Sequence, residues 1–448
     1  MTDIELPKGW AVATLGEVCA QSGRKSSREE TDCPPRFLGL DDIAPDEGRI
    51  ISHHLSSEIS GSGSAASSGD ILYCRLRPYL NKVAVAEGDY LCSGELLVFC
   101  ANDDITGSYV AHWLRSDAFV SFAIQNSKGD RPRVYWTEIA ASSIPLPPGN
   151  EQRRIVNELE RRLSHVDAAV AGLRSAVLRL TAARRSVLNA TASGALLGLD
   201  SSEWQKTTTG EVSEVRGGIQ KQPKRMPVEN TRPFLRVANV GRGRLDLSEV
   251  HEIEVFDGEV VTYALKAGDL LVVEGNGSVD QIGRAASWDG SIEECVHQNH
   301  LIRVRPNDSL DPHFLALVWN APSSIEQLKA IASSTSGLHT LSTGKIKNIT
   351  LRLPNLNVQK QLVLEAERRL SLLDAAERAV TVSLTKAGQL RRSLLKDAFS
   401  GKLVPQDPND EPADVLLARI RTQREADRME TKKKPRKTNV RKKKEPSL

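Results

Sequence analysis

Two stretches of this sequence, EQRRIVNELERRLSHVDAA at residues 151–169 and VQKQLVLEAERRLSLLDAA at residues 358–376, are closely alike. A constant shift of 207 residues aligns them, and the alignment runs without a gap from Leu146 to Gly194. Two unrelated helices would drift in register, so the chain contains an internal duplication. The matched residues include Gln152 with Gln359, Asp167 with Asp374, and Arg184 with Arg391.

Each copy has the pattern of a long helix with one apolar seam. A proline-rich segment precedes it and a Ser-Gly pair closes it, which are typical start and stop signals. Apolar residues recur at spacings of three and four, the pattern that buries one helix against another. About 42 residues at 1.5 Å each give a rod of roughly 60 Å, a long apolar stripe that needs a partner. The seam comprises Leu163, Val166, Val170, Leu173, Val177 and Leu180 in the first copy, and Leu370, Leu373, Val380, Leu384, Ala387 and Leu394 in the second.

The two helices are expected to pair with each other in antiparallel orientation. The first leaves one globular region and enters the next, whereas the second leaves that region and returns. Three polar residues, Arg184, Glu377 and Arg391, interrupt the seam. The alternative is that each helix is a linker that packs only on its own domain.

The regions before the two helices also resemble each other. The pattern W-x5-GEV opens both, at residues 10–18 and 204–212, and GDIL in the first is matched by GDLL in the second. Short β runs alternate with Gly-rich turns, and one helix is expected late in each region, at residues 108–125 and 312–332. The predicted fold class is α+β: two mixed α/β domains separated by two long antiparallel coiled-coil helices, with pseudo-twofold duplication. The expected division is residues 1–149 for the first domain, 150–198 for the first helical spacer, 199–355 for the second domain, 356–400 for the second spacer and 401–448 for a C-terminal segment with a basic tail.

Charge is distributed unevenly along the 448 residues. The net charge is +3, but nine Lys or Arg stand against two Glu from Met429 onward, so residues 1–428 are slightly acidic. Nucleic acid would therefore bind through local basic patches, with the tail adding attraction to phosphates; a disordered, solubilising tail is the alternative. No run of eighteen apolar residues and no export signal is present, so we expect a cytoplasmic protein.

Catalytic motifs are missing from the sequence. VEGNGSVDQIG keeps only the first two glycines of a dinucleotide-binding fingerprint, and GLHTLSTGKI departs from a P-loop in spacing. The signature by which amino-methyltransferases grip a base is missing, and a nuclease-type carboxylate before a lysine occurs only at Glu430. The six cysteines form no C-x-x-C pair and are expected to be reduced core thiols. His297 and His300 have no further ligands nearby in sequence, so we expect neither a metal site nor a catalytic residue.

Basic, amide and aromatic side chains stand in loops that differ between the halves. Arginine forks suit guanine edges, whereas Asn and Gln suit adenine, so these loops are candidates for reading DNA in the major groove. Ordinary solvated loops are the alternative. The candidate DNA-binding residues are Arg75, Arg77, Tyr79, Asn81, Lys82, Lys128, Arg131, Arg133 and Tyr135 in the first half, and Asn276, Gln281 and Arg284 in the second.

Three segments make the chain similar to the specificity (S) subunits of Type I restriction-modification systems. LPKGWAVATLGEV resembles the opening of a target-recognition domain, and IPLPPGNEQRRIV resembles the start of the helical spacer of that family. SGKLVPQDPNDEPADVLLARI resembles its C-terminal ending. The second domain departs from the family pattern, because it begins with EWQKTTTGEV, and the basic tail looks like an extension.

The resemblance implies a non-catalytic reader of a bipartite DNA target, with one target-recognition domain per half-site. It also implies two modification (methyltransferase) subunits and restriction (translocase and nuclease) subunits as partners. S-adenosylmethionine, ATP and Mg would then belong to these partner subunits, and no cofactor is expected in this chain. Two other classes stay open: an enzyme acting on nucleic acid, and a duplicated coiled-coil adaptor that binds only proteins.

Overall fold

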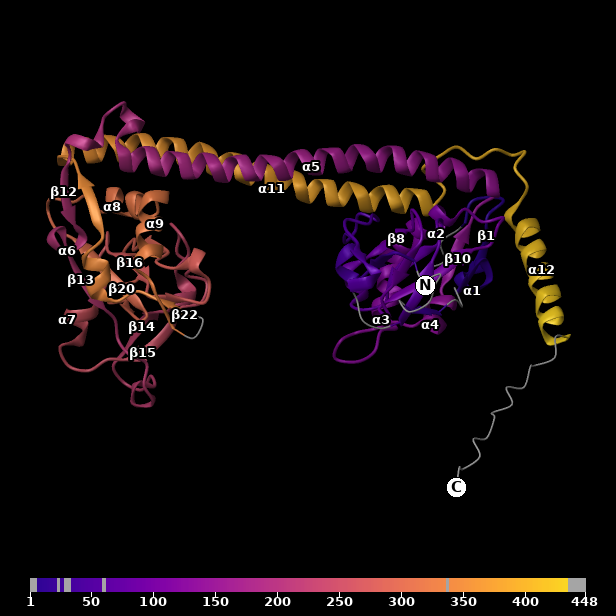
Figure 1. The fold of residues 1–448 in the computed structure, drawn as a ribbon, viewed down its shortest axis with the longest axis horizontal. Coiled ribbons are helices and arrows are strands. Elements are labelled where there is room, and N and C mark those ends of the chain that lie inside the picture. The colour runs from indigo at the N-terminus through magenta and orange to yellow at the C-terminus, as the bar shows by residue number, and fades with distance from the viewer. Residues whose placement is uncertain (1–5, 22–24, 28–33, 59–61, 336–337, 434–448) are drawn as a thin grey trace, which may run out of the picture. The chain divides into compact units, whose positions relative to one another are not determined.

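The structure is a computed structural model, and it describes the chain except residues 1–5, 22–24, 28–33, 59–61, 336–337 and 434–448. The chain divides into two compact units: unit 1 is residues 1–173 with 383–448, and unit 2 is residues 174–382. Both divisions fall inside long helices, α5 (Gly149–Ser193) and α11 (Leu356–Phe399), so each unit contains part of both (Figure 1). The predicted α+β class with two long helices is confirmed.

Unit 1 is built around a four-stranded sheet of order β2-β10-β7-β8 and a five-stranded sheet of order β3-β6-β9-β4-β5. The pair β1–β11 joins the start of the domain to the strand that leads into α5. The strands are β1 (Ala11–Thr14), β2 (Cys19–Gln21), β3 (Lys25–Ser27), β4 (Arg36–Leu38), β5 (His54–Leu55), β6 (Ser62–Ala66), β7 (Ile71–Cys74), β8 (Val83–Val85), β9 (Tyr90–Cys92), β10 (Leu96–Ala101) and β11 (Ser143–Leu146). The helices are α1 (Leu15–Val18), α2 (Gly107–Leu114), α3 (Asp117–Gln125), α4 (Trp136–Ala140) and α12 (Ala413–Lys433).

Unit 2 repeats the four-stranded sheet and part of the five-stranded one. Its four-stranded sheet has the order β13-β20-β16-β18, and the parallel pair β4–β9 of unit 1 has its counterpart in β14–β19. The strands are β12 (Gln205–Thr208), β13 (Ser213–Gly217), β14 (Thr231–Leu235), β15 (His251–Glu254), β16 (Leu270–Val273), β17 (Gly275–Asn276), β18 (Ala285–Ser287), β19 (Val296–His297), β20 (Leu301–Pro306), β21 (Ser333–Thr335), β22 (Leu338–Thr340) and β23 (Thr350–Leu353). The helices are α6 (Thr209–Val212), α7 (Glu259–Tyr263), α8 (Pro312–Trp319), α9 (Pro322–Ile331) and α10 (Thr343–Lys347).

The prediction of a single helix late in each domain is wrong, because each predicted helix is divided into two helices. In unit 1 the break lies at Arg115 and Ser116, where the Ser116 hydroxyl accepts a hydrogen bond from the Phe119 amide and starts α3. In unit 2 it lies before Pro322, which occupies the first turn of α9. A local cap therefore interrupts an apolar pattern that is otherwise continuous.

The predicted helical seam is buried or half-buried in both units. In unit 1, Leu163 and Val166 of α5 share a core with the end of α11, where Phe399 packs edge-on against Tyr109 and Trp113. In unit 2, α11 contributes Leu362 and Ala366 to the domain core. Each helix therefore packs on its partner helix and on a domain, which combines the two alternatives that the sequence left open.

A buried glutamine fixes the start of each long helix. Gln152 is fully buried, accepts a hydrogen bond from the Thr106 amide and donates one to the Pro147 carbonyl. Gln359 does the same with the Asp311 amide at 2.7 Å and the Pro354 carbonyl at 2.8 Å. Thr106 and Asp311 are the residues before α2 and α8, so each glutamine fastens a spacer helix to the helical layer of its own domain.

Candidate nucleic-acid interface

Two loops of unit 1 that are far apart in sequence lie against each other. The Arg75 carbonyl accepts a hydrogen bond from the Val134 amide at 3.1 Å, and the Arg77 amide donates to the Pro132 carbonyl at 2.7 Å. Leu76 packs on the core between the two arginines. The structure therefore brings together the two basic segments that the sequence singled out, residues 75–77 and 128–135.

Glu95 joins the two loops through its carboxylate. It accepts hydrogen bonds from Arg133, with Nη2 to Oε1 at 2.8 Å, and from Nε of Arg75 at 3.3 Å. The bonds from Arg133 and the charge of Arg75 lower the pKa of Glu95, although partial burial opposes this shift. The sequence does not point to Glu95, since a single acidic residue before a β run carries no local signal.

Aromatic and basic side chains lie on or next to the two loops that Glu95 joins. The Arg75 guanidinium lies 5.5 Å from the centre of the Tyr135 ring, a cation–π contact. Tyr79, Arg77 and Arg131 are exposed. Lys128 forms an ion pair with Glu138 at 3.2 Å. This surface offers arginine forks and aromatic faces together, which suits base edges and phosphates.

Two further predicted DNA-binding residues, Lys82 and Asn81, form hydrogen bonds within the domain. Lys82 is 8% exposed, and its ammonium donates to the Leu40 carbonyl at 2.7 Å. The Asn81 amide donates to the Asp46 carboxylate and to the Arg115 carbonyl. Contact of these two side chains with DNA stays a prediction, and the observed hydrogen bonds would compete with it.

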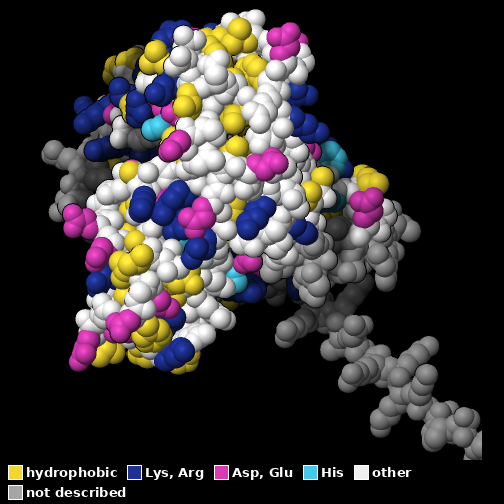
Figure 2. Space-filling view, turned by 90° about the vertical axis from the view of Figure 1, so that its left-hand side faces the viewer, with side chains coloured by type: hydrophobic (Ala, Val, Ile, Leu, Met, Phe, Trp, Pro, Cys, Tyr) yellow, Lys and Arg dark blue, Asp and Glu magenta, His cyan; other side chains and the backbone are white. Residues whose placement is uncertain are grey.

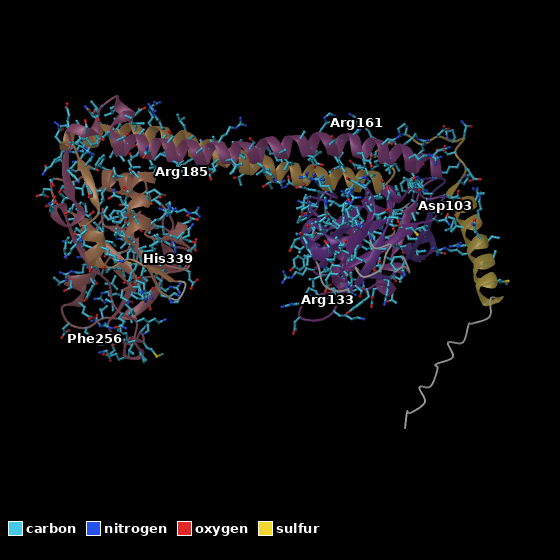
Figure 3. The ribbon with its side chains drawn as sticks, viewed as in Figure 1. Asp103, Arg133, Arg161, Arg185, Phe256 and His339 are labelled. Atoms are coloured by element: carbon cyan, nitrogen blue, oxygen red, sulfur yellow. The ribbon has the colours of Figure 1, made fainter. Side chains whose placement is uncertain are left out.

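Unit 2 has the equivalent pair of loops. The Glu274 carbonyl accepts from the Leu341 amide at 2.8 Å, as Arg75 does from Val134, and Asn276 pairs with His339 between β17 and β22. Figure 3 shows Arg133 and His339, each at the surface of its own unit. The sequence does not point to His339, because nothing in its local pattern links it to Asn276.

Gln281 and Arg284 stand in different environments. Gln281 is exposed at the end of a 3-10 turn, Val279–Gln281. Arg284 donates from Nε to the Val240 carbonyl at 2.7 Å and from Nη2 to the Val237 carbonyl at 3.2 Å. Its DNA contact likewise stays a prediction.

Arg284 occupies the position of Lys82 in the duplicated scaffold. The Lys82 carbonyl accepts from the Cys74 amide at the end of β7, and the Arg284 carbonyl accepts from the Val273 amide at the end of β16, both at 3.0 Å. Each cation holds the 3-10 turn that follows β4 or β14, Leu40–Asp42 or Val237–Asn239. These two cations therefore stabilise equivalent turns in the two domains.

Charges of both signs are mixed on the surface. On the face drawn in Figure 2, Lys and Arg side chains form several separate groups among acidic and hydrophobic side chains. This pattern agrees with local basic patches in a folded part that is slightly acidic.

The two histidines of HQNH differ in environment. His297 is fully buried, and burial, followed by the charge of Arg303, lowers its pKa to about 3. His300 is half exposed and donates from Nδ1 to Glu274 at 2.8 Å. Among the residues that the structure describes, no group of three or more His, Cys, Asp or Glu could hold a metal ion. The described helices include none long and apolar enough to span a membrane.

The prediction that the cysteines are core thiols holds for four of them. Cys19, Cys74, Cys92 and Cys295 are buried and free, and burial raises the pKa of Cys19, Cys92 and Cys295 to about 12. The prediction is wrong for Cys100, which is exposed because its side chain points from β10 away from the core. Cys33 lies outside the described residues.

Comparisons with known proteins agree with this architecture. Residues 201–364 match the model of the Type I restriction modification DNA specificity domain. The chain is similar to the specificity subunits of Type I restriction-modification systems. The EcoKI specificity subunit of Escherichia coli K12 is 26% identical over 72% of this chain and 73% of its own length. The StySPI specificity subunit of Salmonella potsdam is 28% identical over 71% of this chain and 72% of its own.

Two solved structures share the fold. A chain from a structure that describes complex assembly and conformational transition of the type I R-M system has a TM-score of 0.72 at 22% identity, over 89% of this chain and 99% of that one. The HsdS subunit from Thermoanaerobacter tengcongensis has a TM-score of 0.51 at 22% identity, over 90% of this chain and 99% of that one. At this identity the likeness concerns the fold.

Proposed function

We propose that this chain is the DNA sequence-specificity subunit of a Type I restriction-modification complex. Each domain reads one half of a bipartite duplex target through the paired loops at the ends of β7 and β16. The chain itself is non-catalytic and scaffolds the subunits that carry out methylation and cleavage.

One observation supports this proposal most strongly. The two domains share sheet order and backbone hydrogen bonds at the loop pair, yet the side chains that those loops present differ. A protein that reads two unlike half-sites needs one scaffold with two different surfaces. An adaptor that binds two copies of one protein partner would keep those surfaces alike.

The proposal includes partners and their location. Two modification subunits would bring S-adenosylmethionine and the adenine methyltransferase site, and restriction subunits would use ATP and Mg to translocate and cut DNA. The complex would act in the cytoplasm, where the chromosome is. The function of this chain is then to choose the sequence at which those subunits act.

The decisive experiment is sequence-specific protection. The full chain, mixed with modification subunits from the same cell, is incubated with a duplex library, and methylated sequences are identified. Methylation confined to a split, asymmetric motif supports the proposal. Methylation or cleavage by the purified chain alone would show an enzyme, and methylation without sequence preference would favour an adaptor.

A further inference from the structure

At one pair of equivalent positions, the loops of the two domains contain a hydrogen-bonded pair of side chains with reversed polarity. The Arg75 amide donates to the Glu95 carbonyl at 3.0 Å, and the Glu274 amide donates to the His300 carbonyl at 2.9 Å. Arg75 and Glu274 thus occupy equivalent positions, as do Glu95 and His300. Unit 1 has a cation at the first position and a carboxylate at the second, whereas unit 2 has a carboxylate at the first and an imidazole at the second.

In unit 1 this pairing leaves the end of the arginine available. Arg75 donates a hydrogen bond from Nε to Glu95, and its guanidinium lies over the ring of Tyr135. Its Nη1 and Nη2 make no hydrogen bond to any residue that the structure describes, and the side chain is 26% exposed. A guanidinium held at Nε presents two parallel donors, the geometry that matches O6 and N7 of guanine.

In unit 2 the same position presents an acceptor. Glu274 receives the His300 hydrogen bond on Oε2, and Oε1 accepts no hydrogen bond within the described part of the chain. The carboxylate is 31% exposed. A carboxylate oxygen in the major groove accepts a hydrogen bond from an exocyclic amino group, best attested for N4 of cytosine.

We propose that these equivalent positions read opposite base edges: Arg75 reads a guanine in one half-site, and Glu274 reads an amino-bearing base, cytosine or adenine, in the other. Glu95 and His300 are positioning residues that orient these two readers. The inference rests on the proposed function, because it assigns base chemistry to the recognition loops. It explains how one backbone frame supports two specificities, since only the side-chain polarity at one position is inverted.

The test exchanges the pair between domains. The variant Glu274→Arg with His300→Glu carries the pair of unit 1 in unit 2. The full chain with its modification subunits is used to select from duplexes with both half-sites randomised. At one base pair of the second half-site, the preference should change from cytosine or adenine to guanine by about 5- to 150-fold, while the first half-site stays as in the parent.

Two further variants keep the test decisive if the exchange disturbs folding. Glu274→Ala removes the carboxylate acceptor and should weaken the preference at the same base pair without creating one for guanine. Arg75→Ala should remove a guanine preference in the first half-site alone. If folded variants keep the parental preferences in both half-sites, the inference is overturned although the proposed function stands. If the parent chain selects no sequence at all, the proposed function fails and this inference fails with it.

Discussion

Arg184 of α5 donates a hydrogen bond from Nη2 to the carboxylate of Asp374 in α11. Arg391 of α11 makes the same bond to Asp167 of α5, and the two pairs are related by the shift of 207 residues. Each helix thus donates from its own arginine and accepts at its own aspartate, which is possible only when the two helices run antiparallel. The polar interruptions of the seam thus take part in interhelical ion pairs in both units, and in unit 2 Arg184 also pairs with Glu377 at 3.4 Å.

These ion pairs should contribute unequally to stability. Arg184 is 36% exposed and Arg391 is 11% exposed, so solvent screens the first pair more. Double-mutant cycles on melting temperature, with alanine at each position, should give a coupling of at most about 1 kcal/mol for Arg184–Asp374. The coupling for Arg391–Asp167 should be larger. Equal couplings would show that burial does not control them.

The buried glutamine of α11 should be costly to replace. Gln359→Leu leaves the Asp311 amide and two carbonyls without partners, at a cost of about 3 kcal/mol. Hydrogen exchange at the Asp311 amide should accelerate, and unit 2 should melt earlier. Gln361→Leu, an exposed position on the same helix, is the matched control and should leave both measurements unchanged. Equal effects of the two variants would contradict the role of this clamp.

Acid should weaken both helices through a matched pair of glutamates. Hydrogen bonds from Arg161 and Arg162 lower the pKa of Glu158 to about 2, and those from Arg368 and Arg369 do the same for Glu365. Because the folded pKa lies below the ordinary 4.5, this stabilisation is present above about pH 4.5 and is lost as the pH falls toward 2. Helicity measured by circular dichroism at low salt should fall across that window.

The variant Glu158→Gln with Glu365→Gln is the control for this acid effect. It should start with slightly lower helicity at pH 5 and lose less between pH 5 and 2, since it has no carboxylate to protonate. Parallel curves for the variant and the parent would refute the assignment.

Lengthening both helices should change the spacing of the target. One heptad inserted after Arg174 and one after Thr381 preserves the seam and adds roughly 10 Å, about three base-pair steps. Selection with fixed half-sites and random gap length should give a longer gap, with the same bases read. Affinity should drop at the best new spacing, because three base pairs also rotate the duplex by about 100°. An unchanged gap in a folded variant would mean that the helices do not set it.

The basic tail should act without sequence preference. Residues 434–448, which lie outside the described part of the chain, hold seven Lys or Arg and one Glu. Ending the chain at Lys433, where α12 ends, should weaken binding to all DNA and reduce its dependence on salt, with half-site preference unchanged. Titrations at several salt concentrations measure this slope, and an identical slope in the shortened chain would reject the prediction.

The sequence by itself determined the duplication and the two long helices, and it predicted their antiparallel pairing. Helical periodicity and a constant offset between Arg184 and Arg391 are properties of the chain read in order, so they need no knowledge of contacts. The lack of known catalytic motifs is also a property of the sequence alone. The candidate loops could be found too, because they are where the two halves cease to be alike.

Only the tertiary structure decided which charges of those loops are free and which are engaged. Arg75, Glu95 and Arg133 meet across gaps of twenty to nearly forty residues, and no local pattern marks such a meeting. Lys82 and Arg284 are predicted DNA-binding residues, and the structure shows in addition that each holds a neighbouring turn. The physical reason is that a hydrogen-bond partner depends on which backbones the sheets bring together. The residue type alone does not distinguish a cation that can face DNA from one that fastens the fold.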